Sequence, residues 1–529
     1  MLASAALACA LALALALAPP AAAAAASASA AAAAAIAARS RRAPLLPNAG
    51  QARMVSAGAP TSPGPQLTQF MHFGPCTYEG CQWNNDLYPA ANFAPTDLDA
   101  DQWVAVAKSW GATEICLTAR HSDGFALWRT NRTSYGIKES PFRGGQGDVM
   151  REFVDACRRG GVLPCVYFGV STDLDQAVHV KNDTEAHINN LGMLEELLTL
   201  YGPLSRLWWD GFATACGSSS NGTCRTSRNG APSYSCSRPN EIMAPDCSAW
   251  FDFVELVRRV SPGTLMVPGP DGNLVNPEEP GSTYPLFHAV QPPYAVPDPA
   301  ANTTQVNGCY WQGNPGLDDP NAAFAVAESD FTIYYPPHTS WFWTGGPWMS
   351  ASGLWQQYLL KAGLGAAFIL NIPPDKTGQI NASMAATVAE LGAALSATYL
   401  SPVASLPGGG APVTLPACRN TSLIVELAPA GAAFDQVVLT EGLEARGQIV
   451  TGFTLEVERA AAPNVWAPLP GDRAAGSTVG ARVTALTGAA VTGASRLRFN
   501  CTRSADPDDA TPVTISMFSA FLSKPPVGP

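Results

Sequence analysis

The segments "GDVMREFVDACRRGG" at 147–161 and "VLPCVYFGV" at 162–170 decide the fold. In the first segment apolar residues recur with helical spacing, Asp148 precedes them as a helix cap, and a glycine pair ends the pattern. The second segment is a short apolar run, which is typical of a strand buried on both faces. A helix that leads directly into such a strand indicates an α/β domain with a parallel sheet.

The same helix-then-strand order recurs along the chain. We predict four further helix–strand pairs, at 97–111 with 113–119, 189–202 with 204–211, 250–263 with 264–272, and 354–366 with 367–374. Repeats of about 30 to 40 residues favour a (β/α)8 barrel of the TIM type over 61–398. A doubly wound sheet is the alternative, but no glycine fingerprint follows a strand.

A second domain is expected at 405–529, where the pattern changes to alternation with period two. The runs "SLIVELA", "FDQVVLTEGL", "IVTGFTLEVER", "ARVTAL" and "ASRLRFNCT" are separated by turn residues, and no long helical pattern interrupts them. This texture predicts a C-terminal antiparallel β-sandwich.

The charge balance and the missing motifs restrict the function. The chain has 529 residues, a formal net charge of −11 and a pI near 5.1, which argues against a nucleic-acid partner. There is no CxxC pair, P-loop or dinucleotide fingerprint, so we expect neither a metal nor an organic cofactor. After the first residues no apolar run is long enough to anchor the chain in a bilayer. The oligomeric state is left open.

The N-terminus predicts a secretory route. Residues 1–24 have an apolar core followed by small residues, which is typical of a signal peptide, although a basic start is missing. A transit peptide is the alternative, because Arg39, Arg41 and Arg42 follow. Residues 25–60 are rich in Ala and then in Pro, Gly and Ser, and we expect a disordered leader there. The expected location is extracellular or a lytic compartment.

Cysteines and glycosylation sequons agree with that compartment. Four cysteines, Cys216, Cys224, Cys236 and Cys247, fall in a Gly/Ser-rich insertion at 213–247 without metal-ligand spacing, which favours disulfides whose pairing is open. N-x-S/T sequons predict N-glycosylation at Asn131, Asn182, Asn221, Asn302, Asn381, Asn420 and Asn500.

Polar and aromatic residues follow the predicted strands at the ends where a TIM barrel carries its active site. These residues are His72, His121, Tyr167, Asp210 and the pair Glu278–Glu279, with further aromatic and amide groups in "SWFWTGG" and "FILNIPP". Aromatic faces beside hydrogen-bonding groups suit a sugar ring. Two carboxylates on different strands are what glycosidic cleavage requires, one as nucleophile and one as acid/base.

The run 118–170, which starts "TARHSDGFALW", resembles the retaining α-L-fucosidases, family 29 of the glycoside hydrolases. "QFMHFG", "YGPLSRLWWDG", "SWFWTGG" and "FILNIPPDKTGQI" resemble the same family in the same order over about 66–395, and the sandwich fits too. "NFAPTDLDADQWVAVAK" and "GPDGNLVNPEE" are similar to the plant-like branch. The resemblance implies hydrolysis of terminal α-linked L-fucose from a fucosylated glycan.

The resemblance also implies roles for individual residues. The nucleophile falls on Asp210 and the acid/base on Glu278, with the adjacent Glu279 as the alternative. The substrate-binding residues that the resemblance implies are His72, Gln82, Trp83, His121, Tyr167 and Trp208.

Two positions depart from the family pattern. Ser122 stands where a second histidine is usual, and Gln82 stands where a glutamate is usual. Both side chains can still form hydrogen bonds with a hydroxyl, but a structural role is an equal alternative. These departures motivate a second hypothesis, a fucose-binding protein on the same scaffold without turnover.

Overall fold

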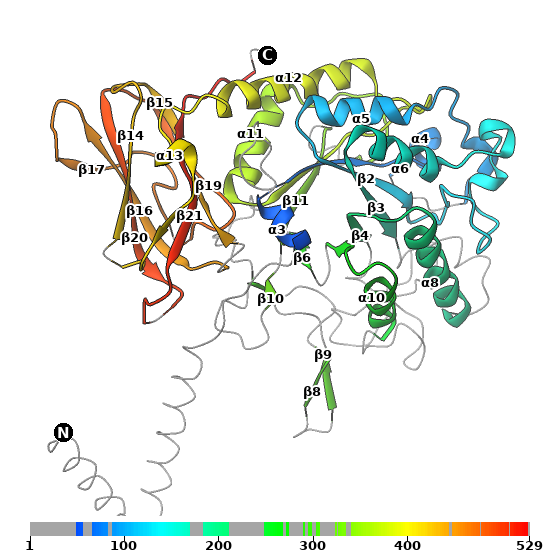
Figure 1. The fold of residues 1–529 in the computed structure, drawn as a ribbon. Helices are drawn as coiled ribbons and strands as arrows, with labels where there is room; N and C mark the ends of the chain where they lie inside the picture. Colours follow the sequence, from blue (N-terminus) through cyan, green and yellow to red (C-terminus); the bar gives the residue numbers. More distant parts are fainter. Residues whose placement is uncertain are drawn as a thin grey trace, which may run out of the picture.

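The structure is a computed structural model of the full chain, and its two domains are shown in Figure 1. The residues that it describes are 49–56, 66–82, 87–169, 183–210, 248–267, 271–274, 289–290, 295–298, 303–306, 323–324, 326–334, 340–419, 421–443, 447–476, 478–506 and 508–526. The predicted signal peptide, the insertion 213–247 with its four cysteines, Trp83 and the pair Glu278–Glu279 lie outside these residues.

The first domain is built on an eight-stranded sheet with the order β5-β4-β3-β2-β1-β12-β11-β6, and neighbouring strands in this order run parallel. Its strands are β1 Leu67–Met71, β2 Glu114–Arg120, β3 Leu163–Gly169, β4 Arg206–Asp210, β5 Leu265–Met266, β6 Gly272–Leu274, β11 Val326–Thr332 and β12 Ala367–Asn371. The two ends of the sheet, β5 and β6, are neighbours in the sequence. The backbone N–H of Asp271 donates to the Met266 carbonyl at 3.2 Å, and the Asp271 carboxylate accepts from the Met266 N–H at 2.9 Å. The sheet therefore curls into a (β/α)8-like barrel, which confirms the predicted fold class.

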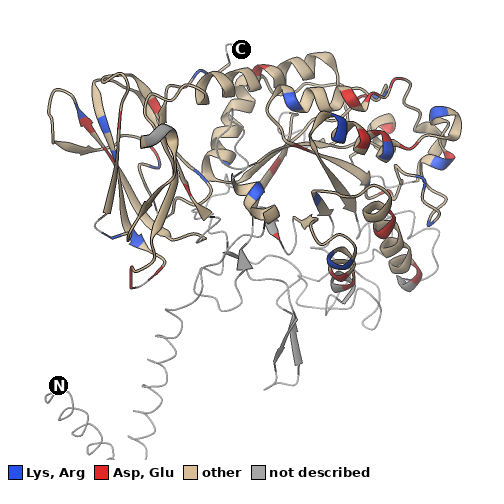
Figure 2. Cartoon of the chain, viewed as in Figure 1, with Lys and Arg blue, Asp and Glu red and all other residues tan. Residues whose placement is uncertain are grey.

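Helices cover the outside of the barrel sheet (Figure 1). They are α4 Pro75–Glu79, α5 Ala100–Ser109, α6 Val149–Gly160, α8 Asp183–Leu200, α10 Ser248–Val260, α11 Ala351–Lys361 and α12 Ala382–Tyr399. The predicted signals of α6 are confirmed, because Asp148 accepts from the Arg151 N–H at 2.8 Å and Gly161 ends the helix with φ 68°. Figure 2 shows that charged residues gather on α5, α6, α8 and α10.

The inside of the barrel is polar at one level. Arg206 of β4 is fully buried and forms ion pairs with Glu114 of β2, at 2.6 Å, and with Glu328 of β11. Thr68 of β1 donates to Glu114 at 3.1 Å. These charged and polar groups connect four strands across the barrel. Each would destabilise the fold if it were buried there without a partner.

The expected disorder of residues 25–60 is wrong for its last part. Residues Ala49–Ser56 form helix α3, and Met54 and Val55 are buried against Leu265, Val267, Val326 and Ala367. Gln51 also donates to the Asp271 carbonyl at 2.9 Å. Two apolar side chains and one amide therefore order this helix against the barrel, although the composition around it resembles a linker.

The second domain is the predicted antiparallel β-sandwich. One sheet has the order β13-β21-β15-β19, and the other has the order β14-β20-β16-β17 with β18 paired to β16. The strands are β13 Val413–Leu415, β14 Thr421–Glu426, β15 Phe434–Glu441, β16 Val450–Arg459, β17 Trp466–Pro468, β18 Ala475–Gly476, β19 Val483–Val491, β20 Ala494–Ser504 and β21 Val513–Phe521. The five predicted strands correspond to β14, β15, β16, β19 and β20, and the sequence pattern missed the long strand β21 and the short strands β13, β17 and β18.

Short elements complete the description. The strand pairs are β7 Ala289–Val290 with β10 Ala323–Phe324, and β8 Ala295–Asp298 with β9 Thr303–Val306, and a short helix α13 spans Pro407–Gly410. Short 3-10 segments lie at Ala90–Asn92, Ile137–Glu139, Phe142–Gly145 and Ala362–Leu364.

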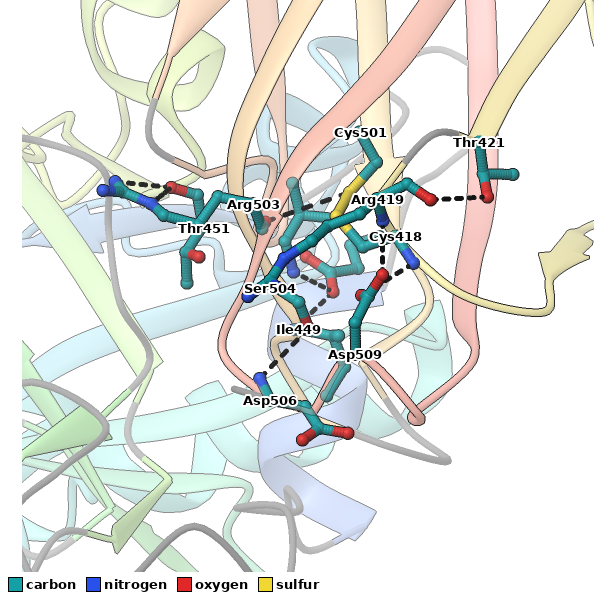
Figure 3. Close-up of a disulfide and its surroundings, with 12 residues drawn as sticks. Cys418, Arg419, Thr421, Ile449, Thr451, Cys501, Arg503, Ser504, Asp506 and Asp509 are labelled. Carbon is teal, nitrogen blue, oxygen red and sulfur yellow. Dashed lines mark hydrogen bonds between the residues drawn. A yellow bond between two sulfur atoms is a disulfide. The ribbon is translucent and has the colours of Figure 1, made fainter. Parts of the chain in front are cut away.

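A disulfide closes the edge of the sandwich. Cys418, just before β14, is bonded to Cys501 of β20, and Asp509 accepts from the N–H groups of Cys418 and Arg419 at 3.0 and 2.7 Å (Figure 3). Two further disulfides among the described residues are Cys76–Cys81 and Cys116–Cys165, so disulfide bonding is confirmed. Cys157 is free and buried.

The two domains share an aromatic contact. The Arg482 guanidinium of the sandwich lies over the rings of Tyr358 and Tyr399, at 5.2 and 4.9 Å from their centroids. Tyr399 also packs against Phe521 at 5.1 Å. A buried cation held between two rings fixes the sandwich against α11 and α12.

Candidate active site

Five of the predicted site residues meet at the C-terminal ends of neighbouring barrel strands. His72 follows β1, His121 follows β2, Tyr167 lies in β3, and Trp208 and Asp210 lie in β4. The two histidines, Tyr167 and Trp208 are buried, whereas Asp210 is exposed. The parallel topology brings them together because carboxyl ends of parallel strands share one face of the barrel.

The rings form a continuous aromatic wall. Tyr167 stacks on Trp208 with centroids 5.5 Å apart, and on its other side it stacks on His121 at 5.4 Å. His72 lies 5.5 Å from His121. Below them Phe70 contacts Trp208 at 5.2 Å. Such a wall offers apolar ring faces and hydrogen-bonding edges to the same ligand.

Asp210 has one of its oxygens occupied by a neighbour. The Tyr167 hydroxyl donates to Oδ2 of Asp210 at 2.7 Å. Burial and the Asp210 charge raise the pKa of Tyr167 well above its usual value, so the tyrosine keeps its proton and remains a donor. This bond fixes the orientation of the carboxylate.

Both histidines are held neutral. Burial, with the nearby His121, holds the pKa of His72 well below its usual range. Burial lowers the pKa of His121 to about 3. His72 Nδ1 lies 2.9 Å from Asn371 Oδ1, and His121 Nδ1 lies 3.1 Å from the Ser122 hydroxyl. Each ring therefore has one nitrogen tied to the protein, and Ser122 acts here as the partner of His121.

Gln82 supports a loop of the site. Its Oε1 accepts from the Trp341 backbone N–H at 2.6 Å, and the Ser340 hydroxyl lies 3.4 Å away. Trp341 in turn lies 5.1 Å from the His72 ring. The structure therefore places Gln82 behind the wall at Trp341, and its predicted contact with substrate stays a prediction.

Sequence reasoning did not assign roles to several residues at the site. Trp341 and Phe342 extend the wall, with Phe342 5.0 Å from His121, and Asn371 holds His72. The segments "SWFWTGG" and "FILNIPP" were noted for their aromatic and amide groups, which was the available signal. Asp330 lies in β11, and no motif in the sequence marks it as a site residue. Burial and the nearby Asp210 raise its pKa to about 6, against the opposing effect of Lys361.

Two acidic residues in the loops have structural roles. Asp123 accepts from the Phe125 N–H at 3.1 Å, and Asp271 binds Arg258 at 2.7 Å in addition to the Met266 N–H. Both carboxylates help to fix loops, and the charge of Asp123 also contributes to the raised pKa of Tyr167. Among the residues that the structure describes, no group of three or more His, Cys, Asp or Glu side chains could hold a metal ion. Every described helix is too short or too polar to cross a lipid bilayer.

Comparisons with known proteins agree with this architecture. The family model described as alpha-L-fucosidase matches residues 66–267. A rice protein (Oryza sativa subsp. japonica) with the name "Putative alpha-L-fucosidase 1" is 30% identical over 320 residues, which cover 60% of this chain and 54% of the rice protein. Alpha-L-fucosidase 1 of Arabidopsis thaliana is 28% identical over 321 residues, covering 60% of this chain and 55% of that protein. The chain therefore spans about half the length of the curated relatives it matches.

Solved structures share the fold. A structure from Bacteroides ovatus, described as a "putative alpha-L-fucosidase", has a TM-score of 0.70 at 24% identity. The match covers 91% of this chain and 74% of the Bacteroides chain. A Ruminococcus gnavus GH29 fucosidase in complex with fucose has a TM-score of 0.69 at 19% identity, covering 91% and 97%. The plant origin of both curated relatives is consistent with the plant-like branch. Residues 66–267 are therefore similar to the α-L-fucosidases, and the chain shares the fold of the solved GH29 structures.

Proposed function

We propose that the protein is a retaining α-L-fucosidase that hydrolyses terminal α-linked L-fucose from glycoproteins or oligosaccharides. The observation that carries this proposal is the environment of Asp210. Its carboxylate is exposed at the end of β4, and Tyr167 holds Oδ2 at 2.7 Å. The stacked rings of Tyr167 and Trp208 stand beside it. An oriented carboxylate next to an apolar ring surface suits nucleophilic attack on a sugar.

The reaction has two displacements. In the first, Asp210 attacks the anomeric carbon and forms a glycosyl ester, while Glu278 gives a proton to the departing oxygen. In the second, Glu278 takes a proton from water, whose oxygen attacks the anomeric carbon and releases Asp210. Glu278 lies outside the described residues, and its role rests on the sequence. Tyr167 would steady the carboxylate through both steps.

The neutral histidines support a sugar ligand. His72 and His121 lie 5.5 Å apart and each has one ring nitrogen not used by its protein partner. A neutral imidazole exchanges hydrogen bonds with hydroxyl groups without placing a charge beside the oxocarbenium-like transition state. Gln82, Trp83 and Trp208 are the further residues that we propose for sugar binding.

A fluorinated substrate tests the nucleophile. A 2-deoxy-2-fluoro fucosyl donor slows the second displacement, so the enzyme accumulates as the glycosyl ester. Mass spectrometry of the digested protein should find the label in the peptide containing residues 205–212. A label elsewhere would remove the assignment. The alternative, a glycan-binding protein without turnover, would bind fucose but release no aryl alcohol from an aryl α-L-fucoside.

Azide separates the two candidate acids. Glu278→Ala should hydrolyse natural fucosides very slowly but still form the ester from activated aryl fucosides, and azide should accelerate its turnover because this small anion needs no general base. Glu279→Ala is the matched control and should stay within a few fold of the parent. Rescue of Glu279→Ala alone would assign the acid/base role to Glu279.

We also propose that the chain enters the secretory route and acts outside the cell or in a lytic compartment. The disulfides Cys76–Cys81, Cys116–Cys165 and Cys418–Cys501 support this proposal, since such bonds persist where the surroundings are oxidising. Expression with the native N-terminus, followed by mass analysis of glycopeptides from the medium, tests it. Protein that stays in the cell without N-glycans would contradict it.

A further inference from the structure

A chain of hydrogen bonds joins Gln82 to His72 through the wall of the site. Gln82 Oε1 accepts from the Trp341 N–H at 2.6 Å. The Trp341 carbonyl accepts from Asn371 Nδ2 at 2.8 Å, and Asn371 Oδ1 lies 2.9 Å from His72 Nδ1. Three separate segments of the chain thus meet in one line. None of these partners is a charged group, so the direction of each hydrogen bond follows from which atoms can donate and which can accept.

The donors and acceptors in this line have only one consistent arrangement. A backbone carbonyl can only accept, so the amide group of Asn371 must turn its Nδ2 to Trp341. The Thr332 hydroxyl agrees, because it donates to the Ser340 carbonyl at 2.7 Å and accepts from Asn371 Nδ2 at 3.2 Å. Asn371 therefore offers only its oxygen to His72, and His72 Nδ1 must carry the proton.

The opposite nitrogen of the ring follows from this. His72 is neutral, because burial and the nearby His121 hold its pKa well below the usual range. A neutral imidazole protonated on Nδ1 has a bare Nε2, which can only accept. Among the described residues none donates a hydrogen bond to His72 Nε2. A ligand at this point must therefore bring its own donor.

We propose that Asn371 is a positioning residue that holds His72 as a hydrogen-bond acceptor, so that the site requires a sugar hydroxyl that donates its proton to His72 Nε2. The inference rests on the proposed fucosidase function for the identity of the sugar, but not for the state of the ring. Gln82 contributes from a distance, because it fixes the peptide of Trp341 to which Asn371 is tied.

Nitrogen NMR of the full-length chain labelled with ¹⁵N-histidine tests the state of the ring. The chain has six histidines, so His72→Gln identifies the signals of His72. In the parent protein Nδ1 should give the shift of a protonated nitrogen and Nε2 that of a bare one. In Asn371→Leu, which removes the acceptor, the proton should move to Nε2. A His72 protonated on Nε2 in the parent, or an unchanged ring in Asn371→Leu, overturns the proposal.

Two further variants guard against a fold that is merely disturbed. Asn371→Asp keeps an acceptor for Nδ1 but loses the donor to Trp341, so His72 should keep its proton on Nδ1. Thr332→Val removes only the second partner of Asn371 Nδ2 and should leave the His72 signals in place. Loss of the Nδ1 proton in either variant would show that Asn371 does not control it.

Modified fucosides test the consequence for specificity. One hydroxyl at a time is replaced by fluorine, which can accept weakly but cannot donate. For the hydroxyl that meets His72, the parent should lose kcat/KM by roughly ten- to hundredfold, mainly through KM. Asn371→Leu should lose several-fold less for that analogue. Equal losses in the two proteins for every analogue would contradict the proposal. If the ring state is as expected but no fucoside is turned over, the proposed function fails while the role of Asn371 stands.

Discussion

The interiors of the two domains differ in where their buried polar side chains lie. The barrel encloses Arg206, Glu114 and Glu328 in its lower part and His72, Asn371 and Thr332 near its mouth, with aromatic rings between them. The central cluster of the sandwich, from Ala404 to Ala520, consists of apolar side chains and the disulfide Cys418–Cys501, and the buried polar residues of this domain, such as Glu441 and Arg482, are not part of that cluster. The comparison teaches that polar groups occupy the centre of the domain where ligand chemistry is proposed, whereas the centre of the sandwich is apolar.

The largest expected effect concerns the barrel alone. Asp210→Asn keeps the shape of the side chain but removes the nucleophile, so kcat/KM should fall by at least about a thousandfold. The free energy of unfolding should hardly change, because Asp210 is exposed. Initial rates on an aryl α-L-fucoside and urea unfolding check the two halves. Asp101→Asn on α5 is the control, and equal activity in both variants would refute the role of Asp210.

The next effect concerns the polar floor of the barrel, which consists of Arg206, Glu114 and Glu328. Arg206→Met leaves the carboxylates of Glu114 and Glu328 buried without their cation and should destabilise the protein by about 3–5 kcal/mol. Arg159→Met is the matched control, since both side chains of its pair with Asp101 are exposed and an exposed ion pair contributes little to stability. Urea unfolding monitored by tryptophan fluorescence measures both. A small loss in Arg206→Met would mean that the barrel floor hydrates easily.

The third effect addresses the sandwich. Leu439→Ala removes a fully buried side chain of β15 and should cost about 3 kcal/mol of unfolding free energy. The activity per folded molecule should stay at the parent level, because none of the described residues of the candidate site lies in this domain. Ile424→Ala on the same domain starts from a side chain that is 39% exposed and should cost far less. A change in KM for Leu439→Ala in the folded state would show that the domains are coupled.

The smallest effect is a pH dependence centred on Asp330. Burial, with the opposing effect of Lys361 and the added repulsion from Asp210, raises the pKa of this carboxyl to about 6, above its value in the unfolded chain. The native state therefore binds more protons than the unfolded state between about pH 4 and 6, and stability falls as pH rises through this window.

Asp330→Asn isolates that contribution. The parent should lose about 1 kcal/mol more than the variant between pH 5 and pH 7, after allowance for solvent screening at a partly exposed group. Glu441, whose pKa burial raises to about 7, contributes equally to both proteins and cancels in the difference. Glu328 adds to the difference in the same direction, because burial and the Asp330 charge both raise its pKa, to about 7, and the variant removes that charge. Parallel pH profiles for parent and variant would place the titration elsewhere.

The comparison also explains which parts of the molecule could be predicted. The barrel was predictable because each helix–strand unit carries local sequence signals, such as the caps Asp148 and Gly161 at the two ends of α6. The site residues on β3 and β4 were predictable because Tyr167 and Asp210 stand at the ends of apolar strands. The role of Asn371 was not, because its bond to His72 joins residues 299 positions apart. Helix α3 was missed because only its contact with the barrel distinguishes it from a linker.

The departures from the family pattern show the same limit. The sequence left Ser122 and Gln82 undecided between sugar binding and support. Ser122 lies beside its chain neighbour His121, whereas the partner of Gln82 is the Trp341 backbone, 259 positions away. A residue type tells what a side chain can exchange, and only the folded structure tells with which neighbour it does so.

The disulfide between Cys418 and Cys501 has a consequence for what happens when a protease cuts the sandwich. The bond joins residues 83 positions apart and closes a loop that contains β14 to most of β20. A single cut in any turn between those cysteines yields two peptides that remain one covalent molecule. On a gel the cut protein should run as one band until a reductant is added, and it should then separate into two. The sandwich is therefore a domain that can be nicked without being shed.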